Sequence, residues 1–422
     1  MFDTDILAER AILISAGGAD CEESLDELAL LAETAGAEVV GRLSQKRDAV
    51  HPGLYLGKGK IEELKQMAEE LGATCAIADD ELTSSQLKKI SAAAGIKIMD
   101  RTLVILDIFA ARASSAEGKT QVELAQLKYR LSHLAGLGTS LSRQGGGGVG
   151  TRGFGIGTRG PGETKLETDR RHIRSRVNQL ESELKEITEV RGTQRERREK
   201  SNIPVVSLVG YTNAGKSTLM NAVCDAGVFA EDKLFATLDT TTRKFKLGAA
   251  GMEALLTDTV GFINKLPHNL IDAFRATLDE LKFSDVLLHV ADMSNPAVEA
   301  QMKVVDKTLE QLGCGGKPII IVYNKSDKAP DFIAPVFAAN FSNVQISAAN
   351  RTNIDLLLEK VEDALRTGRK KMRMLLPYTE GGLLSRLHED CEIVSETHEE
   401  NGTLVTAFIT PEYEGRVLKY VQ

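Results

Sequence analysis

Short apolar runs alternate with amphipathic stretches over the first 115 residues. The run AILISA at 11–16 predicts a buried strand, and the Leu and Ala residues from Leu25 to Ala32 recur at the three- and four-residue spacing of a helix. Strand–helix alternation of this kind is typical of a parallel sheet covered on both faces. We therefore predict an α/β domain of nucleotide-binding type over residues 1–115. Its further strands are expected at 38–43, 74–78 and 96–99, and its further helices at 60–71 and 84–94.

The pattern changes between residues 116 and 200. Apolar residues alternate at intervals of three and four over 119–134 and again over 166–190, so each stretch predicts a helix with one apolar seam. Each seam is too short for a stable coiled coil by itself, and we expect the two helices to pair as an antiparallel hairpin. The alternative is that each helix packs on the core of a neighbouring domain. The seam residues are Leu124, Leu127, Leu131 and Leu134, then Ile173, Val177, Leu180, Leu184 and Ile187.

A glycine-rich segment joins these two predicted helices. Nine of the sixteen residues at 145–160 are glycine, so this segment cannot hold one conformation without a partner. Flexible linkers share this composition. Arginine and phenylalanine among the glycines, however, suit phosphate contacts and base stacking on RNA. We predict that Arg143, Arg152, Phe154 and Arg159 contact nucleic acid.

The charge distribution supports a local RNA-binding surface. The chain has a formal net charge of −8, which excludes a globally cationic nucleic-acid binder. Residues 143–200 nevertheless carry 14 Lys/Arg against 9 Asp/Glu, a net charge of +5, while the rest of the chain carries −13. The hairpin is therefore the part of the chain best suited to bind a polyanion.

A small α+β domain is predicted over residues 369–422. The Asn401-Gly402 pair between two alternating strands is a strong hairpin signal. The expected order is strand 372–376, helix 381–390, strand 392–396, strand 404–409 and helix 412–420.

A phosphate-binding loop follows the apolar run at 203–209. The sequence GYTNAGKS at 210–217 matches the P-loop, in which glycines let backbone N–H groups point at phosphate oxygens. Lys216 is expected to reach the β and γ phosphates, and the Ser217 hydroxyl to ligate Mg²⁺. The nucleotide-binding residues predicted here are Gly210, Tyr211, Thr212, Asn213, Ala214, Gly215, Lys216, Ser217 and Thr218.

A second motif, DTVG, ends the apolar strand predicted at 255–258. Asp258 is predicted to hold Mg²⁺ from the outer shell of ligands, and the Gly261 amide to sense the γ-phosphate. The motif lies 41 residues after Ser217, a spacing that strengthens the assignment. Thr259 and Val260 complete this part of the predicted site.

A threonine-rich loop, FATLDTTTR at 235–243, lies between these motifs. A GTPase needs one threonine hydroxyl that completes the Mg²⁺ shell when the γ-phosphate is present. Thr237 lies 20 residues after Ser217 and 21 before Asp258, so we predict Thr237, with Thr241 as the alternative. We assign Phe235, Ala236, Thr237, Leu238 and Asp239 to the nucleotide site, and Lys216, Thr237 and Gly261 to catalysis.

The NKSD sequence after the strand at 319–323 predicts guanine as the base. The Asp327 carboxylate can accept from both N1–H and the exocyclic amine of guanine, whereas adenine offers no such donor pair. A later strand ends in SAAN, where the Ala348 amide can meet the guanine carbonyl. We therefore predict a GTP-hydrolysing domain over 201–368. Its base-binding residues are Asn324, Lys325, Ser326, Asp327, Ser347, Ala348 and Ala349.

The residue after DTVG departs from a common pattern. Many GTPases have a glutamine there that orients the attacking water, whereas this chain has Phe262. A phenyl ring cannot orient water, so we expect slow intrinsic hydrolysis unless a partner or another group positions the water. A simpler interpretation, compatible with the first, is that Phe262 is a hydrophobic residue of a mobile switch segment.

Taken together, the motifs resemble the HflX family of translation-factor GTPases. The resemblance rests on GYTNAGKST, FATLDTTTR, DTVGFI, NKSD and SAAN, and more specifically on GKGK at 57–60 and GPGETKLETDRR. The family often has proline where this chain has Thr240. The resemblance implies a GTPase that binds GTP and GDP, binds ribosomal RNA of the large ribosomal subunit, and splits or rescues stalled ribosomes or acts in ribosome biogenesis. The alternative is a GTP-dependent switch that acts on a protein or membrane partner without RNA.

The cysteines, the first ten residues and the lengths of the apolar runs indicate where in the cell the protein is expected. Five scattered cysteines show neither zinc nor disulfide spacing, and the acidic first ten residues do not resemble a signal peptide. The apolar runs are too short to span a membrane. We expect a cytoplasmic monomer without stable membrane insertion.

Overall fold

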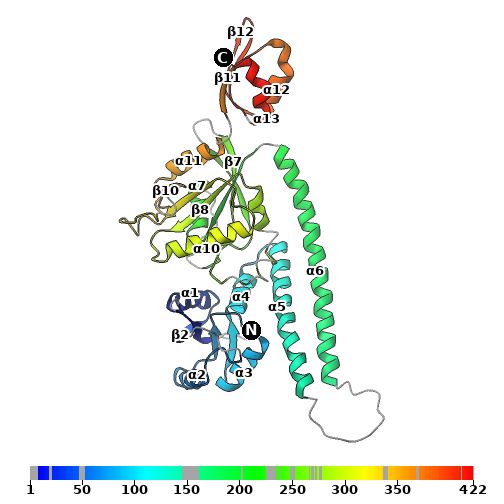
Figure 1. Ribbon diagram of the computed structural model, residues 1–422, viewed down its shortest axis with the longest axis vertical. Coiled ribbons are helices and arrows are strands. Elements are labelled where there is room, and N and C mark those ends of the chain that lie inside the picture. Colours follow the sequence, from blue (N-terminus) through cyan, green and yellow to red (C-terminus); the bar gives the residue numbers. More distant parts are fainter. Residues whose placement is uncertain are drawn as a thin grey trace, which may run out of the picture.

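The structure is a computed structural model with three sheets arranged along one long axis and a pair of long helices beside them (Figure 1). The sheets and their covering helices give the α/β class predicted from the sequence. For the ends of the two long helices, at 135–144, 161–166 and 193–200, the backbone alone is described. The structure describes residues 8–18, 21–46, 53–144, 161–200, 203–224, 234–235, 237–247, 252–265, 267, 270, 273–274, 278–335, 341–366, 370–409 and 411–421.

The N-terminal sheet has the order β2-β1-β3-β4 and is parallel throughout. Successive residues of β1 face opposite sides: Leu13 packs in the same core as Leu25 of α1, while Ile14 packs with Leu64 of α2. This arrangement confirms the predicted parallel sheet with both faces covered. Its elements are β1 (Arg10–Gly17), α1 (Cys21–Thr34), β2 (Glu38–Lys46), α2 (Lys58–Leu71), β3 (Cys75–Ala78), α3 (Ser84–Ala94) and β4 (Lys97–Asp100).

A fourth helix, α4 (Arg101–Arg112), was not predicted from the sequence. Asp100 caps it, because the Asp100 carboxylate accepts a hydrogen bond of 2.9 Å from the Leu103 amide. Most of its residues are buried, so it shows no clear amphipathic alternation. Its last turns carry Phe109, whose ring contacts Phe235 and Phe274 of the central domain.

The long helices α5 (Ala116–Gln144) and α6 (Pro161–Lys200) pack side by side as the predicted hairpin (Figure 1). Leu124 of α5 is buried against Val177 and Leu180 of α6. The Arg176 guanidinium reinforces the seam with two hydrogen bonds, of 2.8 and 2.9 Å, to the Glu123 carboxylate.

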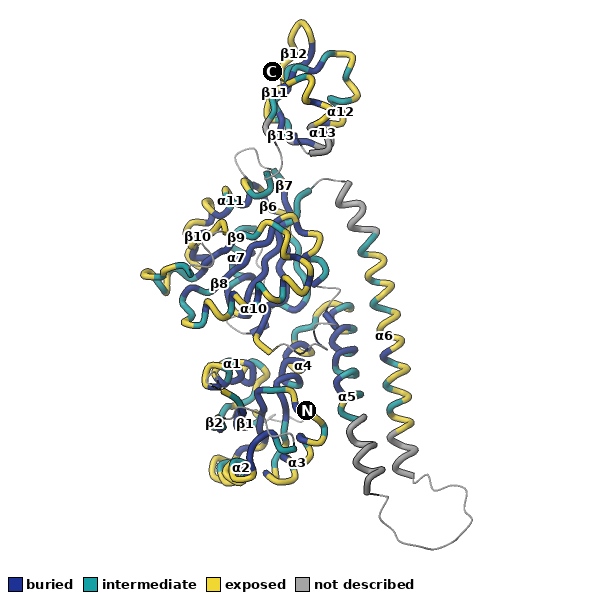
Figure 2. Tube along the Cα trace, in the orientation of Figure 1, coloured by how far each residue is buried: buried dark blue, intermediate teal, exposed yellow. Residues whose placement is uncertain are grey.

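Helix α5 also packs on the N-terminal core. Val122, Ala125 and Tyr129 belong to the same buried cluster as residues of α1 and α4. Helix α5 therefore packs on α6 with one face and on the N-terminal core with another. The alternative interpretation, packing on a neighbouring domain, also holds for this helix. Figure 2 shows the contrast between the two helices, since most of the described side chains of α6 are exposed.

The central sheet has the order β10-β9-β8-β5-β7-β6, and β6 alone runs antiparallel to its neighbour. The threonine-rich segment predicted as a loop to Arg243 becomes strand β6 at Thr241, because it pairs with β7 along the sheet edge. The carboxyl ends of β5, β7 and β9 lie at one edge, where open α/β sheets bind ligands. The elements are β5 (Val205–Gly210), α7 (Lys216–Cys224), β6 (Thr241–Leu247), β7 (Met252–Asp258), β8 (Val286–Asp292), α10 (Val298–Gln311), β9 (Ile319–Asn324), β10 (Ser342–Gln345) and α11 (Ile354–Arg366).

The C-terminal sheet, β11-β13-β12, is antiparallel. Gly402, the second residue of the predicted Asn-Gly turn, has φ of +153°, and a Cβ there would lie 2.2 Å from the Leu376 carbonyl oxygen. Among the described residues no helix combines the length and apolarity needed to cross a membrane. The elements are β11 (Lys370–Leu376), α12 (Gly381–Asp390), β12 (Glu392–Glu399), β13 (Gly402–Ile409), α13 (Pro411–Val417) and a 3₁₀ turn at Leu418–Tyr420.

Candidate active site

The P-loop connects β5 to α7 and surrounds the Lys216 side chain. The Lys216 ammonium donates to the carbonyl oxygens of Gly210 and Tyr211, at 3.2 and 2.8 Å. Burial lowers the pKa of Lys216 to about 8. Gly215 has φ of +92°, and a Cβ there would lie 2.2 Å from Asn324 Nδ2, so the loop requires glycine at this position.

Three oxygen-bearing side chains converge beside the P-loop. The Ser217 and Thr237 hydroxyls lie 2.7 and 3.0 Å from Asp258 Oδ2, and 2.8 Å from each other. Asp258 Oδ1 is buried and has no hydrogen-bond partner among the described residues. Burial raises the pKa of Asp258 despite the nearby Lys216 charge, a cost that a bound cation would offset. Two hydroxyls and a carboxylate are donors that Mg²⁺ prefers, so this group fits that ion.

The alternative switch threonine, Thr241, lies elsewhere. It begins strand β6 and is paired in the sheet with Asp258 through the backbone. The hydroxyl that reaches Ser217 belongs to Thr237. The structure therefore brings the first choice, and not the alternative, to the three-oxygen group.

The base-recognition motifs are joined by Asn324. Its Nδ2 donates to the Ala214 carbonyl at 2.9 Å, and its Oδ1 accepts from the Ala348 amide at 3.0 Å. This side chain therefore ties the P-loop to the SAAN loop. The Ser347 hydroxyl donates to Asp327 at 2.6 Å and lowers the pKa of that exposed carboxylate.

The backbone after DTVG is bound to the P-loop. The Phe262 amide donates to the Gly210 carbonyl at 3.1 Å, and the Thr212 amide donates to the Phe262 carbonyl at 2.8 Å. A Cβ at Gly261 would lie 2.9 Å from Thr212 Cα and 3.0 Å from Lys216 Nζ, so glycine alone fits this approach. The Phe262 side chain is 2% exposed. It is packed into the core here, where it has no means of orienting water.

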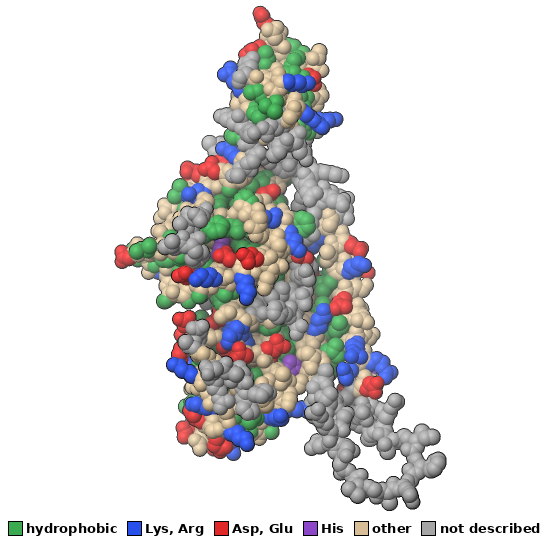
Figure 3. All heavy atoms as spheres, viewed as in Figure 1, with side chains coloured by type: hydrophobic (Ala, Val, Ile, Leu, Met, Phe, Trp, Pro, Cys, Tyr) green, Lys and Arg blue, Asp and Glu red, His purple; other side chains and the backbone are tan. Residues whose placement is uncertain are grey.

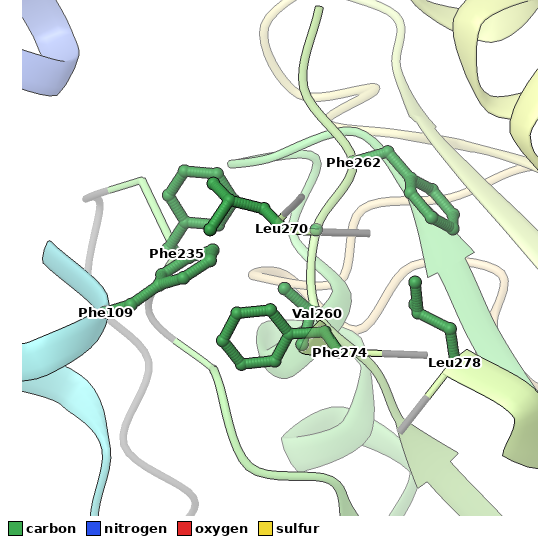
Figure 4. A pocket seen from close by; sticks show the side chains of 8 residues that line it. Phe109, Phe235, Val260, Phe262, Leu270, Phe274 and Leu278 are labelled. Carbon is green, nitrogen blue, oxygen red and sulfur yellow. The ribbon is translucent and has the colours of Figure 1, made fainter. Parts of the chain in front are cut away.

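An apolar pocket lies between α4 and two segments of the central domain: the threonine-rich segment 235–243, here called switch I, and the segment 258–278 that begins at DTVG, here called switch II (Figure 4). The Phe109 ring meets the rings of Phe235 and Phe274 edge to face, with centroids 4.7 and 4.9 Å apart. In Figure 4 the rings of Phe109 and Phe235 lie together, with Phe262 on the opposite side. The pocket is lined by Phe109, Phe235, Val260, Gly261, Phe262, Leu270, Phe274 and Leu278.

A polar network that the sequence analysis missed joins the central and N-terminal domains. Arg101 is 1% exposed and donates to the buried Asp79 at 2.9 Å. Arg101 and the Tyr211 hydroxyl both contact Glu27, and Lys265 contacts Asp79. The one available signal was that Asp79 directly follows β3, at the ligand-binding edge of an open sheet.

Two predicted nucleotide-site residues have side chains directed elsewhere. The Phe235 ring packs in the apolar pocket, and the Asp239 carboxylate accepts hydrogen bonds from Ser114 and Ser115. Both side chains contact residues outside the central domain, and their assignment to the nucleotide site stays a prediction. Ala236, Arg152, Phe154 and Arg159 lie outside the described residues, and Arg143 is described by its backbone alone.

Known proteins match the chain along its length. A family model described as GTP-binding GTPase N-terminal matches residues 22–110, one described as GTP-binding GTPase Middle Region matches 112–198, and one described as 50S ribosome-binding GTPase matches 205–325. GTPase HflX of Caldanaerobacter subterraneus is 50% identical to this chain over 98% of it and 94% of its own length. The chain belongs to the HflX family of GTPases.

A second relative also belongs to this family. GTPase HflX of Escherichia coli is 39% identical over 96% of this chain and 94% of its own length. A solved complex of SsGBP with GDP aligns with 85% of this chain and 99% of its own, at 25% identity and a TM-score of 0.47. As a member of the HflX family, the chain is a P-loop GTPase that binds guanine nucleotides and hydrolyses GTP.

Proposed function

We propose that this GTPase uses Mg²⁺ and acts on the large ribosomal subunit to split or rescue stalled ribosomes. Bound Mg²⁺ would neutralise charge on the β and γ phosphates. Ser217, Thr237 and Asp258 would hold it, because their oxygens already converge. Lys216 would contact the same phosphates, and the Gly261 amide would contact the γ-phosphate.

The shape of the hairpin carries the ribosomal proposal. Helices α5 and α6 run alongside the N-terminal domain, and Gln144 and Pro161 lie at the ends of the hairpin away from the C-terminal domain (Figure 1). Arg130, Arg171 and Arg174 are exposed within about four helical turns of that end. Figure 3 shows blue side chains on this part of the hairpin. An elongated hairpin with exposed arginines supports contact with ribosomal RNA at a distance from the nucleotide.

The base of the hairpin is linked to the central domain by Arg191 of α6. Its guanidinium lies 2.6 Å from Glu117 of α5 and 2.9 Å from Glu280 of the central domain. This three-residue contact supports coupling between the hairpin and the nucleotide. Because the Phe262 ring is buried and cannot orient water, we expect slow GTP turnover by the isolated chain and faster turnover on the ribosome.

The test measures GTP turnover with and without large ribosomal subunits. Wild type should be stimulated, whereas a variant with Arg152, Phe154 and Arg159 changed to alanine should keep basal turnover and lose the stimulation. Lys303→Ala with Lys307→Ala, on α10 of the central domain, is the matched charge-loss control and should behave as wild type.

Two further measurements separate RNA binding from the alternative partner. Affinity for ribosomes should fall steeply with salt if the hairpin binds RNA, and the triple variant should fail in a subunit-splitting assay. A wild-type protein without ribosomal stimulation, or a triple variant that splits ribosomes normally, would contradict the proposal. A protein or membrane partner would then be the better explanation.

A further inference from the structure

The carboxylate of Asp239 in switch I is bound at the base of the hairpin. Its Oδ2 accepts from the Ser114 amide at 3.0 Å, the Ser114 hydroxyl at 2.7 Å and the Ser115 amide at 2.8 Å. Its Oδ1 accepts from the Ser115 hydroxyl. Four donors on one carboxylate make a charge-assisted contact of the stronger kind.

These donors belong to the start of helix α5. Ser115 precedes the helix and caps it, because the Ser115 hydroxyl accepts from the Gly118 amide at 2.8 Å. Asp239 thus lies at the positive end of a 29-residue helix. A Cβ at Gly118 would lie 2.3 Å from Asp239 Oδ1, so glycine makes room for the carboxylate. We call Ser114, Ser115 and Gly118 the serine socket.

The socket holds its carboxylate in the charged form. Burial raises the pKa of Asp239, but the hydrogen bonds from Ser115 and Ser114 outweigh it, so the pKa lies below the usual value.

Asp239 lies two residues after the threonine of the three-oxygen group. Thr237 reaches Ser217 and Asp258, while Phe235, two residues before it, packs against Phe109 of α4. Both flanks of Thr237 are therefore fixed by residues outside the central domain. A two-residue span of chain leaves little freedom between a fixed Asp239 and Thr237.

We propose that Asp239, bound in the serine socket, is a positioning residue that orders Thr237 for the triphosphate state. Closure of switch I and docking of helix α5 are then coupled, so that each favours the other. The link is reciprocal for binding: a nucleotide that needs Thr237 in place also strengthens the Asp239–socket contact. The proposal rests on GTP binding and does not require the ribosomal role.

The test compares affinities for GDP and for a non-hydrolysable GTP analogue with Mg²⁺, in Asp239→Asn and Gly118→Ala. Asparagine removes the charge that the four donors share, and alanine fills the place of Asp239 Oδ1. For both variants, affinity for the analogue should fall about tenfold, within the usual range of coupling between sites, while GDP affinity stays as in wild type. Gly192→Ala in α6, where a Cβ meets nothing within 4 Å, is the matched control and should change neither affinity.

A second readout follows the socket itself. Hydrogen exchange at the Ser114 and Ser115 amides should be slower with the GTP analogue than with GDP in wild type, and this nucleotide dependence should vanish in Asp239→Asn. Equal losses of both affinities, unchanged affinities, or exchange rates independent of the nucleotide in wild type would each overturn the proposal. No ribosome enters the assay, so its outcome is independent of the ribosomal proposal.

Discussion

The Lys265 ammonium of switch II contacts the Asp79 carboxylate at the end of β3 in the N-terminal domain. Asp79 is fully buried and also receives hydrogen bonds from Ser24 at 2.6 Å and Arg101 at 2.9 Å. A residue of the GTPase machinery thus occupies the edge where an open α/β sheet would bind a ligand. The N-terminal domain therefore contacts switch II here, as it does switch I through Phe109.

Removing the Asp79 charge should destabilise the protein more than removing its surface partner. Asp79→Asn leaves the buried Arg101 without its full counter-charge, and the loss should be about 3 kcal/mol of unfolding free energy. Lys265→Ala should cost about 1 kcal/mol or less, because the Lys265 side chain is 37% exposed. Urea unfolding followed by circular dichroism measures both. Equal losses of unfolding free energy in the two variants would mean that the buried pair of Asp79 with Arg101 is not the dominant contact.

The Asp79 contribution should disappear in acid. Burial raises the pKa of Asp79, but the contacts with Lys265, Ser24 and Arg101 lower this pKa by more than burial raises it. The folded pKa therefore lies below the usual value. The stabilisation is then fully present above the unfolded pKa of about 3.9 and is lost as pH falls through the folded pKa. The stability difference between wild type and Asp79→Asn should be constant from about pH 5 to 8 and shrink below about pH 4. A difference that changes between pH 6 and 8 would point to another titrating group.

Base selection should depend on the Asp327 carboxylate. Asp327→Asn presents an amide that can donate to the C2 carbonyl of xanthine, so preference should move from guanine to xanthine nucleotides. Competition binding between GDP and XDP measures the change. Lys328→Gln is a control next in sequence and should keep guanine preference. Unchanged tight GTP binding by Asp327→Asn would reject the assignment of the NKSD motif.

Alanine variants should show which of the two candidate threonines of switch I acts in the triphosphate state. Thr237→Ala should leave GDP binding intact and weaken GTP-analogue binding about tenfold, the cost of one lost hydrogen-bonding ligand. Thr241→Ala should have little effect, because Thr241 is held in strand β6. Titration of Mg²⁺ at fixed analogue concentration should show a weaker metal dependence for Thr237→Ala alone. The reverse result would make Thr241 the switch threonine.

The sequence alone determined the parts of the protein that depend on local chemistry. The P-loop, DTVG and NKSD motifs are short segments whose chemistry depends on neighbouring residues, and glycine is required within them at Gly215 and Gly261. The parallel N-terminal sheet and the hairpin followed from the spacing of apolar residues, because burial on one or two faces imposes that spacing.

Tertiary structure decided the contacts between residues distant in sequence. Lys265 with Asp79 and Asp239 with Ser115 join positions 186 and 124 residues apart, and no local pattern encodes such partners. The burial of the Phe262 side chain was likewise visible only in the structure. Sequence spacing favoured Thr237 over Thr241, and the structure brings the Thr237 hydroxyl to Ser217 while Thr241 is paired in strand β6. Local sequence fixes backbone conformation and the pattern of burial, whereas the identity of a side chain's partner depends on how whole domains come together.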